Sequence, residues 1–174
     1  MAYWKNVKSY DTRMLNLHAV RLTIPDGANI VLGQSHFIKT VEDVYEAVVN
    51  TVPGAKFGVA FNEASGPCLT RGDGTTDEMK KAALDIATAV GAGHFFAVVM
   101  RDCFPINVLR AIQSVPEVCS IFCASANPVE VIVAESEQGR GVLGVIDGSS
   151  PKGVESDEHV TARRDFLRRI GYKR

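Results

Sequence analysis

The stretch Gly33-Gln34-Ser35-His36-Phe37-Ile38-Lys39-Thr40 joins two segments of different periodicity. Residues 29–32 form a short, mostly apolar run rich in β-branched side chains, which predicts a strand. After the stretch, apolar residues recur at helical spacing until Pro53-Gly54, which predicts a helix. Thr40 with Asp43 three residues later is typical of a helix N-terminus. We therefore expect this stretch to lead from the end of a strand into the start of a helix.

The chemistry of this loop favours a bound anion such as a phosphate group. The first N–H groups of a helix lack partners within it, and the helix dipole is positive there. Gly33 lets the backbone approach a ligand closely. The loop also supplies hydrogen-bonding, titratable and charged side chains, namely Gln34, Ser35, His36 and Lys39. The local pattern alone also fits an ordinary loop histidine beside a solvated lysine.

Composition and charge are those of an ordinary globular protein. The 174 residues suit one domain with a full-sized core, and 46% are hydrophobic and 22% charged. The net charge of −1 offers no global field that would attract nucleic acid or a membrane. No apolar run has the length of a membrane span, and residues 1–10 lack a signal-peptide core. We expect a cytoplasmic protein.

The four cysteines predict neither a disulfide framework nor a metal site, because they lack the spacing of zinc ligands. Cys119 and Cys123 are expected to face the same side of one strand. Scattered cysteines within apolar runs are most often small buried hydrophobic residues.

The rest of the chain alternates predicted strands and helices. Helices are expected to begin at Thr40, Thr75, Pro105 and near Ser156; strands are expected at residues 15–24, 29–32, 56–64, 68–71, 94–100, 118–124, 129–135 and 142–146. Pro25-Asp26-Gly27 predicts a hairpin between the first two strands, and Gly72-Asp73-Gly74 is expected to end a short strand. This order predicts a single α/β domain, a mixed β-sheet with helices packed on it.

Two patterns resemble binding motifs without their usual context. Gly139-Arg140-Gly141-Val142-Leu143-Gly144 has the spacing of a dinucleotide-binding loop, but it leads into a β-like segment, so we reject that site. Arg140 at the tip of a glycine-rich hairpin either approaches a phosphate or is simply exposed. The C-terminal helix is basic, and we interpret it as a solvated face.

Polar residues collect where several predicted strands end or begin. They are Asn62, Glu63, Ser65, Asn127, Glu135 and Asp147. Open α/β sheets bind ligands at such strand ends, so together these residues predict a polar cleft. Taken singly, each is better explained by turn capping. His94 opens the strand at 94–100 and is either a second candidate histidine or a cap at the strand edge. Carboxylates here are candidates to hold Mg²⁺ beside phosphate oxygens or to act as a base.

Several long motifs resemble the adenosine-specific kinase family. They are Gly-Gln-Ser-His-Phe-Ile-Lys-Thr-Val-Glu-Asp at 33–43, Phe-Gly-Val-Ala-Phe-Asn-Glu-Ala-Ser-Gly at 57–66, Gly-Ala-Gly-His at 91–94, Val-Pro-Glu-Val-Cys at 115–119, Ala-Asn-Pro-Val-Glu-Val-Ile-Val-Ala-Glu at 126–135, Gln-Gly-Arg-Gly-Val-Leu-Gly-Val-Ile-Asp-Gly at 138–148 and Pro-Lys-Gly at 151–153. The similarity covers residues 15–173. Residues 1–14 are then an N-terminal extension, and residues 15–174 are the family domain.

This resemblance implies an enzyme that transfers a phosphoryl group to adenosine, giving AMP, through a phosphohistidine. It also implies a homo-oligomer, with a trimer favoured. His36 is the first candidate for the phosphorylated residue and His94 the second. Lys39 and Glu63 are the other expected catalytic residues. The residues expected to bind adenosine or phosphate are Gln34, Ser35, Ser65, His94, Asn127, Arg140 and Asp147.

The expected cofactor is Mg²⁺ accompanying a nucleotide phosphate donor. An adenine-nucleotide sensor without turnover is the main alternative function. A mainly structural oligomer is the weaker third alternative.

Overall fold

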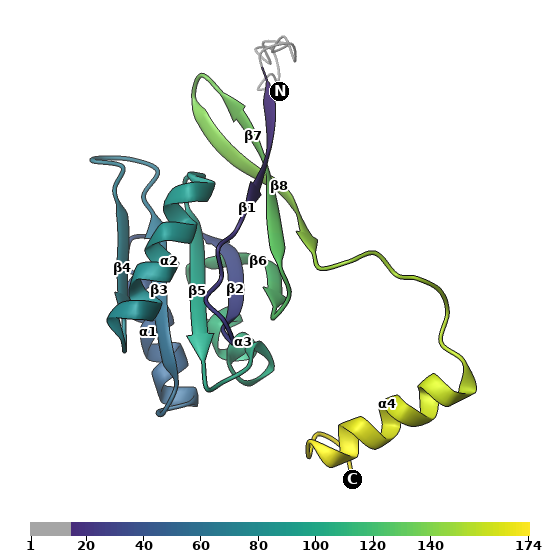
Figure 1. The fold of residues 1–174 in the computed structure, drawn as a ribbon. Helices are drawn as coiled ribbons and strands as arrows, with labels where there is room; N and C mark the ends of the chain where they lie inside the picture. Colours follow the sequence, from purple (N-terminus) through teal and green to yellow (C-terminus); the bar gives the residue numbers. More distant parts are fainter. Residues whose placement is uncertain (1–14) are drawn as a thin grey trace, which may run out of the picture.

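The computed structural model describes residues 15–174, which form two antiparallel sheets and four helices (Figure 1). The five-stranded sheet has the order β4 (Thr70–Gly74), β3 (Lys56–Asn62), β5 (Phe95–Arg101), β2 (Asn29–Ser35) and β6 (Val118–Ser125). The three-stranded sheet has the order β1 (Asn16–Arg21), β7 (Val129–Ser136) and β8 (Gly139–Asp147). The helices are α1 (Thr40–Thr51), α2 (Asp77–Val90), α3 (Pro105–Gln113) and α4 (Asp157–Arg169). The predicted α/β domain is confirmed, with its strands divided between two sheets. The described residues include no helix that is long and apolar enough to cross a membrane.

The five-stranded sheet is covered on both faces, which explains why its central strands are almost wholly apolar. Side chains alternate between the faces, so Ile30 and Leu32 of β2 join one core while Val31 joins the other. The first core is closed by α2 and by the inner face of the three-stranded sheet. The second is closed by α1 and α3. The sheet therefore forms a rigid centre whose ends carry the loops.

A glycine permits α2 to approach the sheet closely. A Cβ atom added to Gly58 in β3 would lie 2.2 Å from the carbonyl oxygen of Met79 in α2. At the other end of α2, Gly91 has a φ of 63°, the left-handed conformation that ends many helices. The predicted end of this helix is confirmed.

The predicted hairpin between the first two strands is wrong. The N–H of Ala28 does donate to the carbonyl of Pro25 in a turn, but β1 pairs with β7, and Val20 lies opposite Val131. The chain crosses from one sheet to the other after this turn. Val20 can then pack against the core beneath the three-stranded sheet.

The prediction that Gly72-Asp73-Gly74 ends a strand is also wrong, because these residues belong to β4 and pair with β3. A Cβ atom at Gly72 would lie 2.9 Å from Leu84 of α2. The glycines here make room for the helix and do not break the strand.

Two predicted helix caps differ in the structure. Lys39, not Thr40, is the N-cap residue of α1, and the buried Thr40 hydroxyl instead donates to Ser35 Oγ at 2.7 Å. At α2 the cap is Thr76, while Thr75 accepts from the N–H of Phe57. Both threonines that the sequence predicts as caps instead form hydrogen bonds to residues outside the helix. The expected starts of α3 at Pro105 and of α4 near Ser156 are confirmed.

All four cysteines are free thiols. Cys123 is buried, as expected of a small hydrophobic residue in an apolar run, whereas Cys119 is exposed, so that expectation is wrong for Cys119. The pairing of β6 with β2 shifts register between Leu32 and Gly33, and this irregularity lies between the two cysteines.

Candidate functional site

Polar residues from four strands meet at one end of the five-stranded sheet. The N–H of His94 donates to the carbonyl of Asn62 at 2.8 Å, and the N–H of Ser35 donates to the carbonyl of His94 at 3.0 Å. The N–H of His36 donates to the carbonyl of Glu117 at 3.0 Å. We call this row the polar edge: Asn62, His94, Ser35, His36 and Glu117. Backbone hydrogen bonds fix its order across β3, β5, β2 and β6.

His36 occupies the expected loop between β2 and α1 and is exposed. Its backbone is anchored to the chain just before β6, but its ring has no hydrogen-bond or ion-pair partner among residues 15–174. The neighbouring Phe37 and Ile38 side chains are also about half exposed. An imidazole on a fixed backbone and open to solvent is available to react with a ligand.

His94 is the second histidine of the polar edge, and its backbone is unusual. Its φ of 63° lies in the left-handed region, which side chains other than glycine rarely adopt. The ring stacks on Phe61, with centroids 5.8 Å apart and an angle of 15° between the planes. Such strained residues occur most often at functional sites. The two backbone hydrogen bonds to Asn62 and Ser35 hold this conformation in place.

Glu117 is the residue that sequence reasoning missed. Only 2% of its surface is exposed, and both carboxylate oxygens are buried without a hydrogen-bond partner in the described structure. Its nearest cation is the Lys39 ammonium group, 3.9 Å from Oε2. A buried carboxylate without donors is costly, so proteins retain such groups mainly where function requires them. The sequence offers only an acid between Pro116 and Val118, which reads as an ordinary turn residue.

Lys39 does not extend freely toward the loop, as the anion-site prediction had supposed. Its Nζ lies 2.5 Å from Asp43 Oδ2, one helical turn along α1. This hydrogen bond is the main reason that the pKa of Lys39 is raised, and the charge of Glu117 adds to it. The ammonium group therefore lies between two carboxylates, and its charge is already balanced.

Glu63 is likewise engaged. Arg71 Nε donates to one carboxylate oxygen at 2.7 Å, and the N–H of Leu69 donates to the other at 3.0 Å. The hydrogen bond from Arg71 is the main cause of the lowered pKa of Glu63. A carboxylate with a lowered pKa is a weak base at neutral pH. This geometry fits a residue that holds the β3–β4 loop better than a general base.

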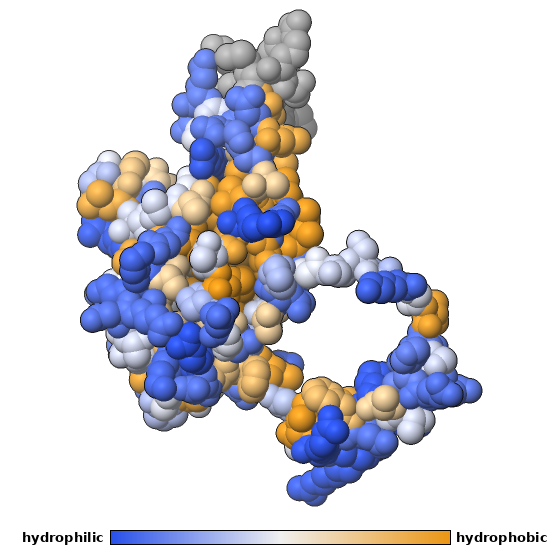
Figure 2. All heavy atoms as spheres, viewed as in Figure 1, coloured by the Kyte–Doolittle hydropathy of each residue, from blue (hydrophilic) through white to orange (hydrophobic). Residues whose placement is uncertain are grey.

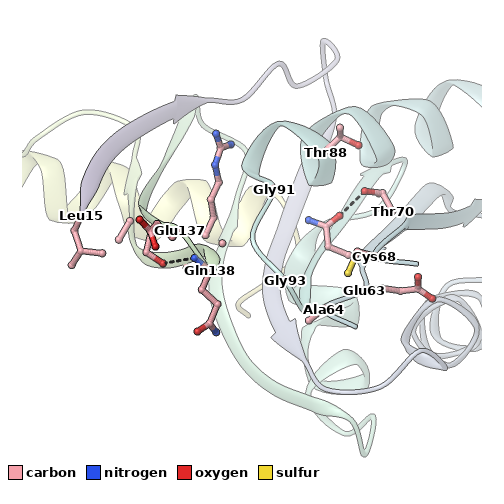
Figure 3. Close-up of a pocket in the computed structure, with 16 residues that line it drawn as sticks. Leu15, Glu63, Ala64, Cys68, Thr70, Thr88, Gly91, Gly93, Glu137 and Gln138 are labelled. Atoms are coloured by element: carbon pink, nitrogen blue, oxygen red, sulfur yellow. Dashed lines mark hydrogen bonds between the residues drawn. The ribbon is translucent and has the colours of Figure 1, made fainter. Parts of the chain in front are cut away.

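A cleft of about 1230 Å³ lies between Asn62 and the β7–β8 hairpin, and the other members of the polar edge, His36 and His94 among them, do not line it. Figure 3 shows Glu137 and Gln138 of the hairpin on one side and Glu63, Cys68 and Thr70 on the other. A smaller hollow of about 230 Å³ is lined by Gln34 and shares Gly93 and Arg140 with the cleft. The structure thus brings together the predicted residues Gln34, Glu63 and Arg140. His94 follows directly after Gly93 in the chain.

Arg140 is held in place by a second ion pair. Its Nε donates to Glu135 Oε2 at 3.1 Å, and the same oxygen lies 3.0 Å from Nε2 of His18. The residue lies near the start of β8 with its side chain in the cleft wall, and Ala92 forms an isolated bridge with it. This position in the cleft wall is consistent with Arg140 facing a ligand. Part of its guanidinium group is already bound to the carboxylate of Glu135.

Asp147 and Asn127 do not join this cleft. They lie at the opposite end of β2, where Ser125 pairs with Ile30 while Ser35 pairs with Val118. Asp147 Oδ1 accepts from the Ser125 hydroxyl at 2.6 Å and from Asn127 Nδ2 at 3.0 Å. These residues brace the junction of β6, β7 and β8.

Ser65 does not line the cleft either. It lies in an exposed turn, where its carbonyl accepts from the N–H of Cys68.

Residues 20–173 match the sequence model of a family described as adenosine specific kinase. The chain belongs to this family. It is also similar to the crystal structure of the PH1918 protein from Pyrococcus horikoshii OT3, with 42% sequence identity and a TM-score of 0.89. That similarity covers 92% of this chain and 99% of the other. No curated protein matches the sequence.

The acids that the sequence marked for Mg²⁺ do not fit a metal site in this member of the adenosine-specific kinase family. Glu63 is paired with Arg71, and Glu135 with Arg140 and His18. Asp147 lies at the other end of the sheet. Within residues 15–174 no group of three or more histidine, cysteine or acidic residues is arranged to hold a metal ion.

Proposed function

We propose that this chain is a phosphotransferase that moves a phosphoryl group from a nucleotide donor to His36 and then to the 5′-hydroxyl of adenosine, giving AMP. Membership of the adenosine-specific kinase family supports the substrate class. The observation that carries the proposal is the polar edge, where the backbone of His36 is fixed and its exposed ring has no partner among residues 15–174. His94 lies on the neighbouring strand end.

In the first step, an unprotonated ring nitrogen of His36 attacks the terminal phosphorus of the donor. A P–N bond forms, and the P–O bond to the nucleoside diphosphate breaks, leaving its electron pair on that oxygen. In the second step, the 5′-oxygen of adenosine attacks the same phosphorus and the P–N bond breaks. Both steps need an electropositive surrounding for the phosphoryl oxygens, which the N–H groups of the loop and of the first turn of α1 would supply.

The hydroxyl proton released in the second step needs an acceptor. Glu63 is a poor candidate because its pairing with Arg71 lowers its pKa. We assign this role to the ring of His94, which makes no hydrogen bond or ion pair within the described part of the chain. Adenosine would occupy the cleft beside Gly93, with Arg140 near its phosphate or ribose.

A Mg²⁺ ion would arrive with the donor and be held by its phosphate oxygens, as is usual for nucleotide substrates. No step above is routed through a protein-bound metal.

The test is transfer of radiolabel from terminally labelled ATP. Wild-type protein should acquire an acid-labile, base-stable label, and adding adenosine should move that label to AMP. The His36→Ala variant should lose the label by at least 100-fold, whereas His159→Ala, which changes an exposed histidine on α4, should keep it. Label retained by His36→Ala and lost by His94→Ala would transfer the nucleophile role to His94. Label retained by both would refute the phosphohistidine mechanism.

A second function is favoured by one observation. Lys39 and Glu63 are two of the three expected catalytic residues, and each already forms an ion pair, with Asp43 and Arg71 respectively. Such pairing is expected of residues with a structural role. A sensor of adenine nucleotides would bind AMP or ADP in the cleft without turnover. Calorimetry showing such binding, together with no AMP formed from ATP and adenosine, would establish this alternative.

A further inference from the structure

The three-stranded sheet has an apolar face that nothing in the described structure covers. Val131 and Val133 of β7 point into the core. The alternate positions point the other way and form what we call the outer face: Leu17, Ala19, Ile132, Ala134, Leu143 and Ile146. Leu17 is 68% exposed, Leu143 64% and Ile146 50%. Figure 2 shows this apolar surface in orange over the region of β1 and β8.

The outer face is also open above its glycine residues. Gly144 lies opposite Ile132, and a Cβ atom added to it would meet nothing within 4 Å. The same holds for Gly141, which lies opposite Ala134. Contiguous apolar surfaces of this kind mark interaction sites on soluble proteins.

The C-terminal segment, residues 148–174, is unpartnered as well, and we call it the arm. Figure 1 shows an extended linker leading away from β8 and ending in α4, which stands clear of the two sheets. No residue of α4 is buried. Its ion pair joins Arg163 to Glu155 in the linker, and its cap is Ser156. A helix of 13 residues without tertiary contacts is only marginally stable in water.

The arm nevertheless carries an apolar stripe. Its members recur at helical spacing and are Val160, Phe166, Leu167 and Ile170. A helix with such a stripe normally packs it against another element.

Charge also separates the arm from the rest of the described chain. From Leu15 to Asp147 there are nine lysine and arginine residues and fifteen acids, a formal charge of −6. From Gly148 to Arg174 there are seven lysine and arginine residues and four acids, a formal charge of +3. A basic arm is thus attracted to the acidic body of another copy.

We infer that the arm of one copy packs its apolar stripe across the outer face of a second copy of this chain. Each chain carries both an unpartnered helix and an uncovered apolar face, so one kind of contact satisfies both. The linker leads α4 away from the outer face of its own chain, which leaves a neighbour as the acceptor (Figure 1). Of the outer face only Ala134 also lines the cleft, and the contact involves no residue of the polar edge, so it does not depend on the phosphotransfer mechanism.

The first test measures molar mass by sedimentation of the full-length protein over a range of concentrations. Wild type should associate. The face variant Leu17→Glu/Leu143→Glu and the arm variant Phe166→Glu/Ile170→Glu should each sediment as a monomer at concentrations at least 100-fold above the wild-type midpoint. Ile106→Glu, which places the same charge on an equally exposed apolar residue of α3, should associate like wild type.

A milder variant separates loss of the contact from loss of the fold. Valine suits a strand, and a side chain at position 144 has open space in the isolated chain. The monomeric Gly144→Val protein should therefore unfold at a temperature equal to or higher than that of the monomeric face variant. It should still weaken association at least 10-fold, because the added side chain occupies the space that the partner needs.

The second test mixes the face variant with the arm variant. Each lacks one half of the contact, so the mixture should form a complex that neither variant forms alone. A wild-type chain that stays monomeric at 100 µM would overturn the inference. Failure of the two variants to form a complex when mixed would also overturn it and would indicate that the arm packs within its own chain. Association of the arm variant alone would overturn it too and would indicate that two outer faces contact each other. Association lost on deleting residues 1–14 would instead assign the outer face to the N-terminus.

Discussion

Glu117 shows how a single side chain can be placed for something other than stability. Its carboxylate is buried, lacks a hydrogen-bond donor in the described structure, and lies directly beneath the loop that carries His36. Lys39 lies close to it but is bonded to Asp43. Because the fold gains little from this acid, we interpret Glu117 as a positioning residue for Lys39 and the loop.

Replacing Glu117 with glutamine should therefore raise stability and lower function. Removing a buried charge that has no hydrogen-bond donor should increase the free energy of unfolding by about 1 kcal/mol. Label transfer to His36 should fall about 10-fold, because Lys39 would then be attracted only to Asp43. Urea unfolding and the labelling assay measure the two effects. Glu46→Gln, an exposed change on α1, is the control, and a less stable Glu117→Gln protein would contradict this interpretation.

The ion pair of Glu63 predicts a pH dependence. Its pKa is lower in the folded protein than its usual value of 4.5, chiefly because Arg71 donates to it. The stabilisation is therefore fully present above pH 4.5 and is lost as the pH falls through the lower folded-state pKa. Wild type should be more stable than Glu63→Gln at pH 7, and the two unfolding curves should converge in acid. A difference that persists unchanged at pH 2 would show that the ion pair is not its cause.

The cysteines predict a simple reactivity pattern. Cys68 and Cys119 are exposed, whereas Cys103 and Cys123 are buried. Burial raises the pKa of Cys123 to about 11, with Asp147 adding to the effect, and burial also raises the pKa of Cys103. At pH 8 a thiol reagent should modify Cys68 and Cys119 rapidly, and the other two only after unfolding. Peptide mass spectrometry after timed quenching would identify the modified residues.

At the scale of elements, the contact between α2 and β3 depends on a missing side chain. A Cβ atom at Gly58 would lie 2.2 Å from backbone atoms of α2, which cannot rotate away as a side chain can.

Gly58→Ala should lower the free energy of unfolding by about 3 kcal/mol, because the helix must shift off the sheet. Gly54→Ala is the matched control, since an added Cβ there meets nothing within 4 Å. Chemical denaturation of both variants gives the comparison. Equal stability of the two would mean that α2 does not lie as close to β3 as described.

At the scale of the whole molecule, the arm is the part whose order should depend on concentration. Within one described chain α4 has no buried residue, whereas α2 has six. If the arm packs on a second copy, the amide protons of α4 should become protected from exchange only as the protein associates. The protection of α2 should stay constant.

Hydrogen exchange followed by mass spectrometry at two protein concentrations would measure this difference. Raising the salt concentration should lower the protection of α4, because the basic arm and the acidic body attract each other less strongly. Protection of α4 that is equal at all concentrations would indicate contact within one chain.

The local pattern of the sequence determined most helix and strand positions. Periodicity placed the helices, Pro105 marked the start of α3, and Gly91 marked the end of α2, because these signals act within one or two turns of chain. The motifs around His36, Glu63 and Arg140 also identified the family, and two of these residues, Glu63 and Arg140, line one cleft.

Only the tertiary structure decided which strands pair and which polar residues meet. Asn16 pairs with Glu135, more than a hundred residues away, and no turn signal near either residue specifies that partner. For the same reason the sequence did not separate Asp147 from the cleft or reveal the burial of Glu117. Local chemistry sets the conformation of a segment, whereas pairing and burial depend on the fit of surfaces that are far apart in the chain.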